Sequence, residues 1–148
     1  MPGRRRILIA EDDALIRELI RSRLFAAGYD THTARSGREA IERMFVVRPH
    51  AVLLDINLPD LDGFAVLEAM RDDLQEVAAP VLMLTGRRSP EDVKRAISLG
   101  ARDYLTKDRI EVTLLPRLSR MLKTFAADTA GPSLAVTDPA PGATPPAA

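Results

Sequence analysis

Polar residues that could perform chemistry together lie far apart in this chain, in two acidic clusters followed by a threonine and a lysine. In chain order these residues are Glu11, Asp12, Asp13, Asp55, Thr85 and Lys107. Carboxylates that are held close together repel one another unless a cation lies between them. Because Mg²⁺ prefers oxygen ligands, these residue types predict a divalent-metal site with an ammonium group and a hydroxyl group beside it.

Each of these polar groups directly follows a short apolar segment that has the pattern of a buried strand. The segments are residues 7–10, 51–54, 81–84 and 104–106. The carboxyl ends of the strands in a parallel sheet lie at one edge, where open α/β folds bind their ligands. We therefore expect the separated polar groups to meet at that edge.

The rest of the first 125 residues alternates between strand and helix patterns. Residues 29–33 alternate as a half-buried strand, and three residues are placed to cap helices: Asp13, Ser36 and Ser89. Gly28 is expected to stop the first helix, and Gly63 to supply a permissive φ to the turn formed with Asp60 and Asp62. This alternation predicts an α/β fold with a parallel sheet and right-handed crossovers.

The composition excludes several classes of protein. The 148 residues include 21 basic and 21 acidic ones, and this near-neutral charge does not favour direct binding to nucleic acid. The absence of cysteine excludes disulfides and thiolate metal sites. No apolar run approaches the roughly 18 residues that span a bilayer, and Arg4–Arg6 precedes too short a run for a secretion signal. We expect a cytoplasmic protein that does not contact membranes.

Residues 126–148 differ in composition from the preceding chain. They include eight alanines and five prolines but no aromatic or basic residue. Such a segment cannot bury enough apolar surface to offset the entropy lost on ordering it. We therefore expect one domain over residues 1–125, with a last helix that ends near Phe125, and a disordered Ala/Pro-rich tail from residue 126 onward.

The polar residues and their surroundings resemble the receiver domain of two-component response regulators over about residues 5–125. The shared features are the acidic pair Glu11-Asp12, Asp55 with Leu58-Pro59 and Asp62-Gly63 after it, Thr85-Gly86, and the run from Gly100 to Lys107. These features, which occur in the same order as in the family, make a specific match. The resemblance implies a CheY-like, flavodoxin-like, doubly wound sheet with five parallel strands in the order 2-1-3-4-5.

The same resemblance implies how the carboxylates act. Asp55 would be the phosphoacceptor. Asp12, Asp55 and the backbone carbonyl of Asn57 would bind Mg²⁺ directly. Glu11 would reach the ion through a water molecule, since its side chain is one methylene longer than the aspartate usual at that position.

Three further residues receive roles from the resemblance. Lys107 would neutralise charge on Asp55 and on its phosphoryl group, and Thr85 would hydrogen-bond a phosphoryl oxygen. Tyr104 occupies the position of the family's switch aromatic, which turns inward when the threonine is drawn toward the phosphoryl group. Ordinary packing in the core is an alternative role for Tyr104, because burial and switching have the same pattern in a sequence.

The function implied is that of a single-domain response regulator. It would accept a phosphoryl group from a histidine kinase or a histidine phosphotransfer protein and signal by contact with an unknown downstream protein. It would assist its own phosphorylation and dephosphorylation without being an enzyme for a separate substrate. One alternative is an adaptor module that works without phosphorylation. Another is a Mg²⁺-dependent phosphohydrolase, which Asn57 disfavours because such enzymes usually carry a second catalytic aspartate there.

Two positions depart from the family pattern. Asp108 follows Lys107 where the family usually has proline, often after a cis peptide bond. Because a cis bond without proline costs about 2.5–4 kcal/mol, we expect a trans or a strained loop, in which Asp108 could pair with Lys107. Pro116 lies inside the expected last helix, and proline is tolerated only in a first turn or at a kink. We therefore expect that helix to begin near Thr113 or to bend.

Overall fold

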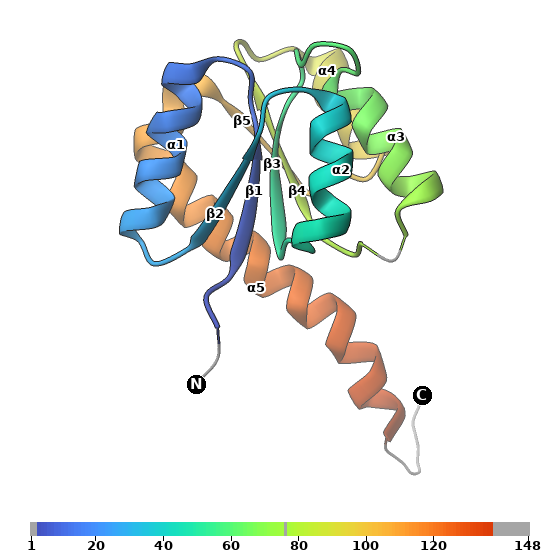
Figure 1. Ribbon diagram of the computed structural model, residues 1–148. Helices are drawn as coiled ribbons and strands as arrows, with labels where there is room; N and C mark the ends of the chain where they lie inside the picture. The colour runs from blue at the N-terminus through green and yellow to red at the C-terminus, as the bar shows by residue number, and fades with distance from the viewer. Residues whose placement is uncertain (1–2, 76, 138–148) are drawn as a thin grey trace.

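The computed structural model describes residues 3–75 and 77–137, in which five strands alternate with five α-helices (Figure 1). The strands are β1 (Arg6–Ala10), β2 (Asp30–Ala34), β3 (Ala51–Asp55), β4 (Val81–Thr85) and β5 (Asp103–Thr106). The helices are α1 (Ala14–Ala26), α2 (Gly37–Val47), α3 (Gly63–Asp73), α4 (Pro90–Ser98) and α5 (Ile110–Thr137), with a 3₁₀ turn η1 (Lys107–Arg109) before α5. The predicted alternation of strands and helices is confirmed.

All five strands belong to one parallel sheet in the order β2-β1-β3-β4-β5. This order confirms the predicted flavodoxin-like architecture. In the sheet register Asp55 at the end of β3 is opposite Leu84, and Thr85 at the end of β4 is opposite Thr106. The strand ends that carry the polar residues therefore lie along a single edge of the sheet.

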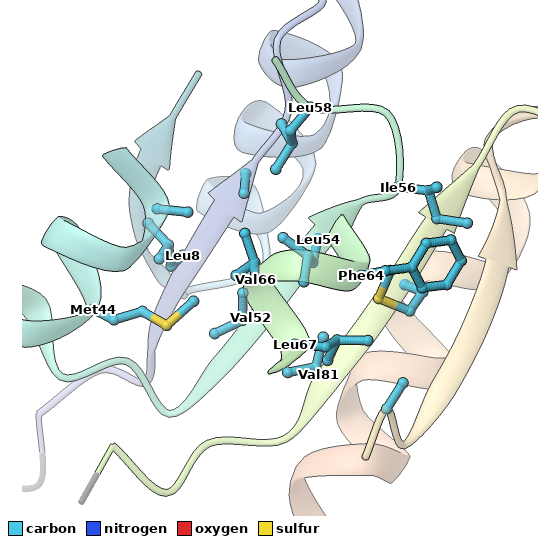
Figure 2. Packing of buried hydrophobic residues seen from close by; sticks show 14 of the residues in the cluster. Leu8, Met44, Val52, Leu54, Ile56, Leu58, Phe64, Val66, Leu67 and Val81 are labelled. Atoms are coloured by element: carbon cyan, nitrogen blue, oxygen red, sulfur yellow. The ribbon is translucent and has the colours of Figure 1, made fainter. Parts of the chain in front are cut away.

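Helices cover both faces of the sheet, with α1 and α5 on one side and α2, α3 and α4 on the other (Figure 1). On the second side, Val52 and Leu54 of β3 pack with Val66 and Leu67 of α3 (Figure 2). On the first side, Leu53 packs in a separate cluster with residues of α1 and α5. Successive side chains of a strand point to opposite faces of the sheet. Because helices cover both faces here, the side chains on both faces must be apolar, which explains the uninterrupted apolar runs in the sequence.

Three helices begin directly after the capping residues that the sequence predicts. Asp13 accepts hydrogen bonds from the backbone N–H groups of Leu15 and Ile16, at 2.9 and 3.1 Å. Ser36 and Ser89 act in the same way at the starts of α2 and α4. Since a cap satisfies backbone donors that have no partner inside the helix, these residues end the loops that follow β1, β2 and β4 and keep them short.

The last helix is longer than predicted. Instead of ending near Phe125, α5 continues to Thr137. The domain boundary at residue 126 and the disorder of the tail stay predictions. Alanine has the highest helix propensity, and two alanines continue the helix past Phe125. Asp128 then forms an ion pair of 2.6 Å with Arg102, whose guanidinium stacks over the Phe125 ring at 5.0 Å. Residues 138–148, the remainder of the predicted tail, lie outside the described residues.

The same helix begins earlier than predicted. The expected start near Thr113 is wrong, because η1 leads directly into α5 at Ile110. The side chains of Ile110 and Leu114 are both 1% exposed, and their burial offsets the backbone hydrogen bond that Pro116 cannot donate. All peptide bonds of the described residues are trans, which confirms the trans alternative for the loop after Lys107.

Candidate functional site

The ends of β1 and β3 bring three carboxylates together. Asp55 is the last residue of β3, and Glu11 and Asp12 directly follow β1. One carboxylate oxygen from each lies within 4.8 Å of the other two. Glu11 and Asp55 are buried, at 0% and 1% exposure, whereas Asp12 is exposed. The acidic residues that were expected to lie together therefore do so, and Asp12 is the exposed member of the cluster.

Lys107, the first residue of η1, directs its ammonium group into this cluster from the end of β5. Its Nζ lies 2.9 Å from Oε1 of Glu11 and 3.2 Å from Oδ2 of Asp55. The ion pairs of Lys107 are thus with these two buried carboxylates, in place of the pair with Asp108 that the sequence suggested. Glu11 therefore pairs directly with Lys107. Its contact with Mg²⁺ through a water molecule stays a prediction.

Burial and the neighbouring charges shift the ionisation of this group. Burial raises the pKa of Glu11; its hydrogen bond with Lys107 acts against this, and the charge of Asp55 adds to it. Burial alone would lower the pKa of Lys107, but the hydrogen bond with Glu11 and the charge of Asp55 outweigh it, so the pKa of Lys107 is raised. Lys107 is therefore a firmly charged partner at neutral pH.

The cluster has the chemistry of a divalent-cation site. Three carboxylates face one ammonium group, which leaves an excess of negative charge within a radius of a few ångströms. Two of them are buried, where water cannot screen their repulsion. The available donors are oxygens, the ligands that Mg²⁺ prefers. The residues present fit this ion.

The hydroxyl groups of Thr85 and Tyr104 meet at one backbone acceptor. Thr85 ends β4 and is 4% exposed, and its Oγ1 donates to the carbonyl of Arg87 at 2.8 Å. The hydroxyl of Tyr104 in β5 donates to the same carbonyl at 3.4 Å. In this structure the Thr85 hydroxyl thus binds the backbone of the β4–α4 connection. Residue types gave no indication of this contact, because every residue carries a backbone carbonyl.

Tyr104 lies where both of its predicted roles are possible. Its side chain is 8% exposed and belongs to the core cluster on the α2–α3–α4 side of the sheet. Its hydroxyl nevertheless reaches the β4–α4 connection through Arg87. The structure therefore shows the core packing of the Tyr104 ring, and the switching role stays a prediction.

The loop after Asp55 closes tightly over the phosphoacceptor candidate. The backbone N–H of Asn57, whose side chain is exposed, donates to Oδ1 of Asp55 at 3.2 Å. The prediction that Gly63 supplies the permissive φ is wrong, because the positive φ of this loop belongs to Asp60, at 61°. Glycine is needed at position 63 for a different reason, because the backbone there lies very close to the end of β3. A Cβ on Gly63 would lie 2.5 Å from the carbonyl oxygen of Asp55.

Comparison with known proteins agrees with the fold. Residues 7–119 match the family of response regulator receiver domains. Response regulator MprA of Mycolicibacterium vanbaalenii is 40% identical over 136 residues, which are 89% of this chain and 57% of that protein. The chemotaxis protein CheY4 of Vibrio cholerae is 34% identical, with a TM-score of 0.75 over 80% of this chain and 99% of CheY4. The BeF3-activated receiver domain of Klebsiella pneumoniae RstA is 32% identical, with a TM-score of 0.73 over 79% and 97%.

The chain belongs to the response regulator receiver domain family of two-component systems. Members of this family are phosphoacceptor signalling modules that receive phosphoryl groups from histidine kinases. The chain spans a little over half the length of the MprA proteins that it matches. Within the described residues, no helix is both long enough and apolar enough to cross a membrane.

Proposed function

We propose that this protein is a Mg²⁺-dependent phosphoacceptor whose Asp55 receives a phosphoryl group from a histidine kinase or a histidine phosphotransfer protein. The observation that carries the proposal is the ion pair of Lys107 with both Glu11 and Asp55 at the edge of the sheet, beside the exposed Asp12. This arrangement places an acceptor carboxylate, a fixed positive charge and additional oxygen ligands in one pocket. The output is contact with a downstream protein.

The proposed reaction is the formation of a mixed anhydride on Asp55. One carboxylate oxygen of Asp55 bonds to phosphorus while the bond between phosphorus and the donor nitrogen breaks, and the donor leaves with that electron pair. Phosphoryl transfer depends mainly on positioning and on charge neutralisation. Lys107 is held 3.2 Å from the acceptor carboxylate and supplies one positive charge to the incoming phosphoryl oxygens.

Asp12 and Asp55, with the carbonyl of Asn57, are the residues proposed to hold Mg²⁺, and Glu11 is proposed to assist through a water molecule. When bound, the ion would neutralise charge on the carboxylates and on the phosphoryl oxygens. Asp12 is exposed and is not engaged by Lys107, so it is free to serve as a ligand. Thr85 is proposed to exchange its contact with Arg87 for a phosphoryl oxygen.

The test is phosphorylation by a small-molecule phosphodonor, followed by mass spectrometry of the intact protein. With acetyl phosphate and Mg²⁺, the wild type should gain one phosphoryl group and the Asp55→Asn variant none. Asp60→Asn is the matched control, because it removes a carboxylate from the same loop at a position with positive φ that asparagine tolerates. Labelling of Asp55→Asn to the wild-type extent would refute the proposal.

The metal requirement has its own measurement. Mg²⁺ that binds only the folded protein raises its melting temperature by mass action. We expect this rise for the wild type and a much smaller one for Asp12→Asn, because that substitution removes one proposed ligand from the open side of the pocket. If Mg²⁺ raised the melting temperature of both proteins equally, Asp12 would not be a ligand of the ion.

A further inference from the structure

Arg17, in the first turn of α1, contacts the backbone of the acidic loop that precedes this helix. One nitrogen of its guanidinium group, Nη1, donates to the carbonyls of Glu11 and Asp12, at 3.0 and 3.2 Å. Both acceptors belong to residues of the carboxylate cluster at the edge of the sheet. Since the acceptors are carbonyl oxygens and not carboxylates, these contacts hold the backbone of the loop.

The two contacts of Arg17 restrict the conformation of Asp12. The carbonyl of Glu11 belongs to the peptide plane before the Cα atom of Asp12, and the carbonyl of Asp12 belongs to the plane after it. Because peptide groups are planar, φ and ψ alone set how these two planes are turned about the Cα atom. Holding both carbonyls at one nitrogen therefore restricts φ and ψ of Asp12, and with them the direction of its Cα–Cβ bond.

Asp12 depends on such a restraint more than its neighbours in the loop do. The N–H of Glu11 donates to the carbonyl of Ala34 at 3.0 Å, and its carboxylate pairs with Lys107. Asp13 is held as the cap of α1. The side chain of Asp12 is exposed and forms no hydrogen bond or ion pair with another described residue. The backbone of Asp12 is therefore what positions its carboxylate.

Electrostatics alone does not explain an arginine at this position. The N-terminal end of a helix carries partial positive charge, so a cation in the first turn is unfavourable for α1. The same charge would also repel a metal ion bound at the neighbouring carboxylates. Because both effects oppose the arginine, what Arg17 contributes to the site is geometric.

We propose that Arg17 is a positioning residue for the Mg²⁺ site: by holding the carbonyls of Glu11 and Asp12, it keeps the Asp12 carboxylate beside those of Glu11 and Asp55 before the ion binds. A ligand that is already in place loses less conformational freedom on binding. Groups that orient metal ligands contribute about 10–100-fold to the affinity for the metal. The inference rests on the function proposed above and adds a residue that acts on the ion through Asp12.

Titration of the whole protein with MgCl₂ at constant ionic strength, followed by the shifts of its amide signals in NMR spectra, tests this inference. Arg17→Met removes both donated hydrogen bonds and should weaken Mg²⁺ binding by about tenfold or more. Arg17→Lys should regain part of the affinity, because both bonds come from a single nitrogen and an ammonium group can donate both. Arg21→Met removes the same charge one turn later on α1, where Arg21 pairs with Glu18, and should bind Mg²⁺ like the wild type.

A second comparison separates positioning from a general structural role. In a protein that also carries Asp12→Asn, Arg17→Met should have little further effect on Mg²⁺ affinity, because the carboxylate that Arg17 positions is gone. The same fold-loss with and without Asp12 would overturn the proposal, as would an Arg17→Met protein that binds Mg²⁺ as tightly as the wild type or more tightly. The amide signals without Mg²⁺ report whether each variant is folded, and Arg17→Gln takes the place of Arg17→Met if the latter is not.

Labelling by acetyl phosphate, followed by mass spectrometry, separates this proposal from the phosphoacceptor proposal. At limiting Mg²⁺, Arg17→Met should label more slowly than the wild type, and at saturating Mg²⁺ the difference should shrink, because Asp55 and Lys107 are unchanged. If Mg²⁺ affinity depended on Arg17 as expected but the wild type gained no phosphoryl group, the phosphoacceptor proposal alone would be refuted. Normal labelling of the wild type, with a Mg²⁺ affinity that Arg17→Met leaves unchanged, would overturn the positioning role alone.

Discussion

At the scale of single residues, Lys107 has the most consequential position. Its ammonium group contacts two buried carboxylates, Glu11 at 2.9 Å and Asp55 at 3.2 Å. Truncating one partner of a buried ionic cluster leaves the remaining charges unpaired in a medium that screens them poorly. The lysine therefore contributes to stability as well as to the proposed transfer of the phosphoryl group.

We expect Lys107→Ala to lower the free energy of unfolding by about 1–3 kcal/mol in metal-free buffer, because Glu11 and Asp55 would then repel each other without a counter-charge. Urea denaturation with a chelator present measures this loss. Added Mg²⁺ should restore part of it, since the ion would supply positive charge to the same carboxylates. Lys94→Ala, an exposed lysine on α4, is the control and should stay within about 0.5 kcal/mol of the wild type. Equal stability of the Lys107 and Lys94 variants would contradict the assignment.

At the scale of secondary-structure elements, the site depends on how closely α3 approaches the end of β3. The N–H of Gly63, the first residue of α3, donates to the carbonyl of Ile56 at 2.7 Å. A side chain at Gly63 would collide with the backbone of Asp55 and Ile56. The loop that carries Asn57 is thereby held against the end of β3, where the N–H of Asn57 donates to the Asp55 carboxylate.

Gly63→Ala should destabilise the protein by about 1–3 kcal/mol, because the added methyl group overpacks a rigid backbone contact. Gly86→Ala is the matched comparison: Gly86 also lies just beyond a strand of the same edge, but a Cβ there meets no atom within 4 Å. Chemical denaturation of the two variants should separate them clearly. A Gly63→Ala protein as stable as Gly86→Ala would show that the loop can move away without loss.

At the scale of the whole molecule, the edge of the sheet opposite the site is held by a different polar cluster. The backbone N–H of Arg6 at the start of β1 donates to Nδ1 of His50 at 2.9 Å, and the N–H of His50 donates to the carbonyl of Arg6 at 2.8 Å. The Arg6 guanidinium also binds the carbonyls of Val47 and Arg48. These contacts join β1 to the end of α2 and the start of β3.

The stability of the whole fold should depend on the ionisation of His50. Burial lowers the pKa of His50, and the positive charges of Arg6 and Arg5 lower it further. A histidine with a lowered pKa in the folded state binds protons more readily when unfolded, so stability falls as pH drops below the ordinary value of about 6.5.

The variant that tests this is His50→Asn. Asparagine keeps an oxygen that can accept the hydrogen bond from the N–H of Arg6, but its side chain does not titrate. Denaturant titrations above and below about pH 6.5 should show a smaller acid-side loss of stability for this variant than for the wild type. His32→Asn removes the other histidine of the chain and should retain the wild-type loss. Identical pH dependence in all three proteins would exclude His50 as the cause.

Much of the fold and the site could be predicted from the sequence because the signals are local. Apolar runs of four or five residues, capping residues such as Asp13 and Ser89, and polar residues at strand ends all depend on neighbours in the chain. The meeting of Glu11, Asp55 and Lys107 follows from such signals once the strands are taken as parallel. The strand order was predicted from the resemblance to receiver domains and not from these signals.

Only the tertiary structure decided features that depend on contacts between distant segments. The role of Gly63 depends on the Asp55 backbone, and the shared contact of Thr85 and Tyr104 depends on the carbonyl of Arg87. The start and end of α5 were mispredicted because burial of apolar residues outweighed Pro116, and Arg102 gives Asp128 a partner. Residue types thus determined which groups reach the edge of the sheet, whereas packing determined which partner each group binds, since partners are set by distance in space and not by spacing along the chain.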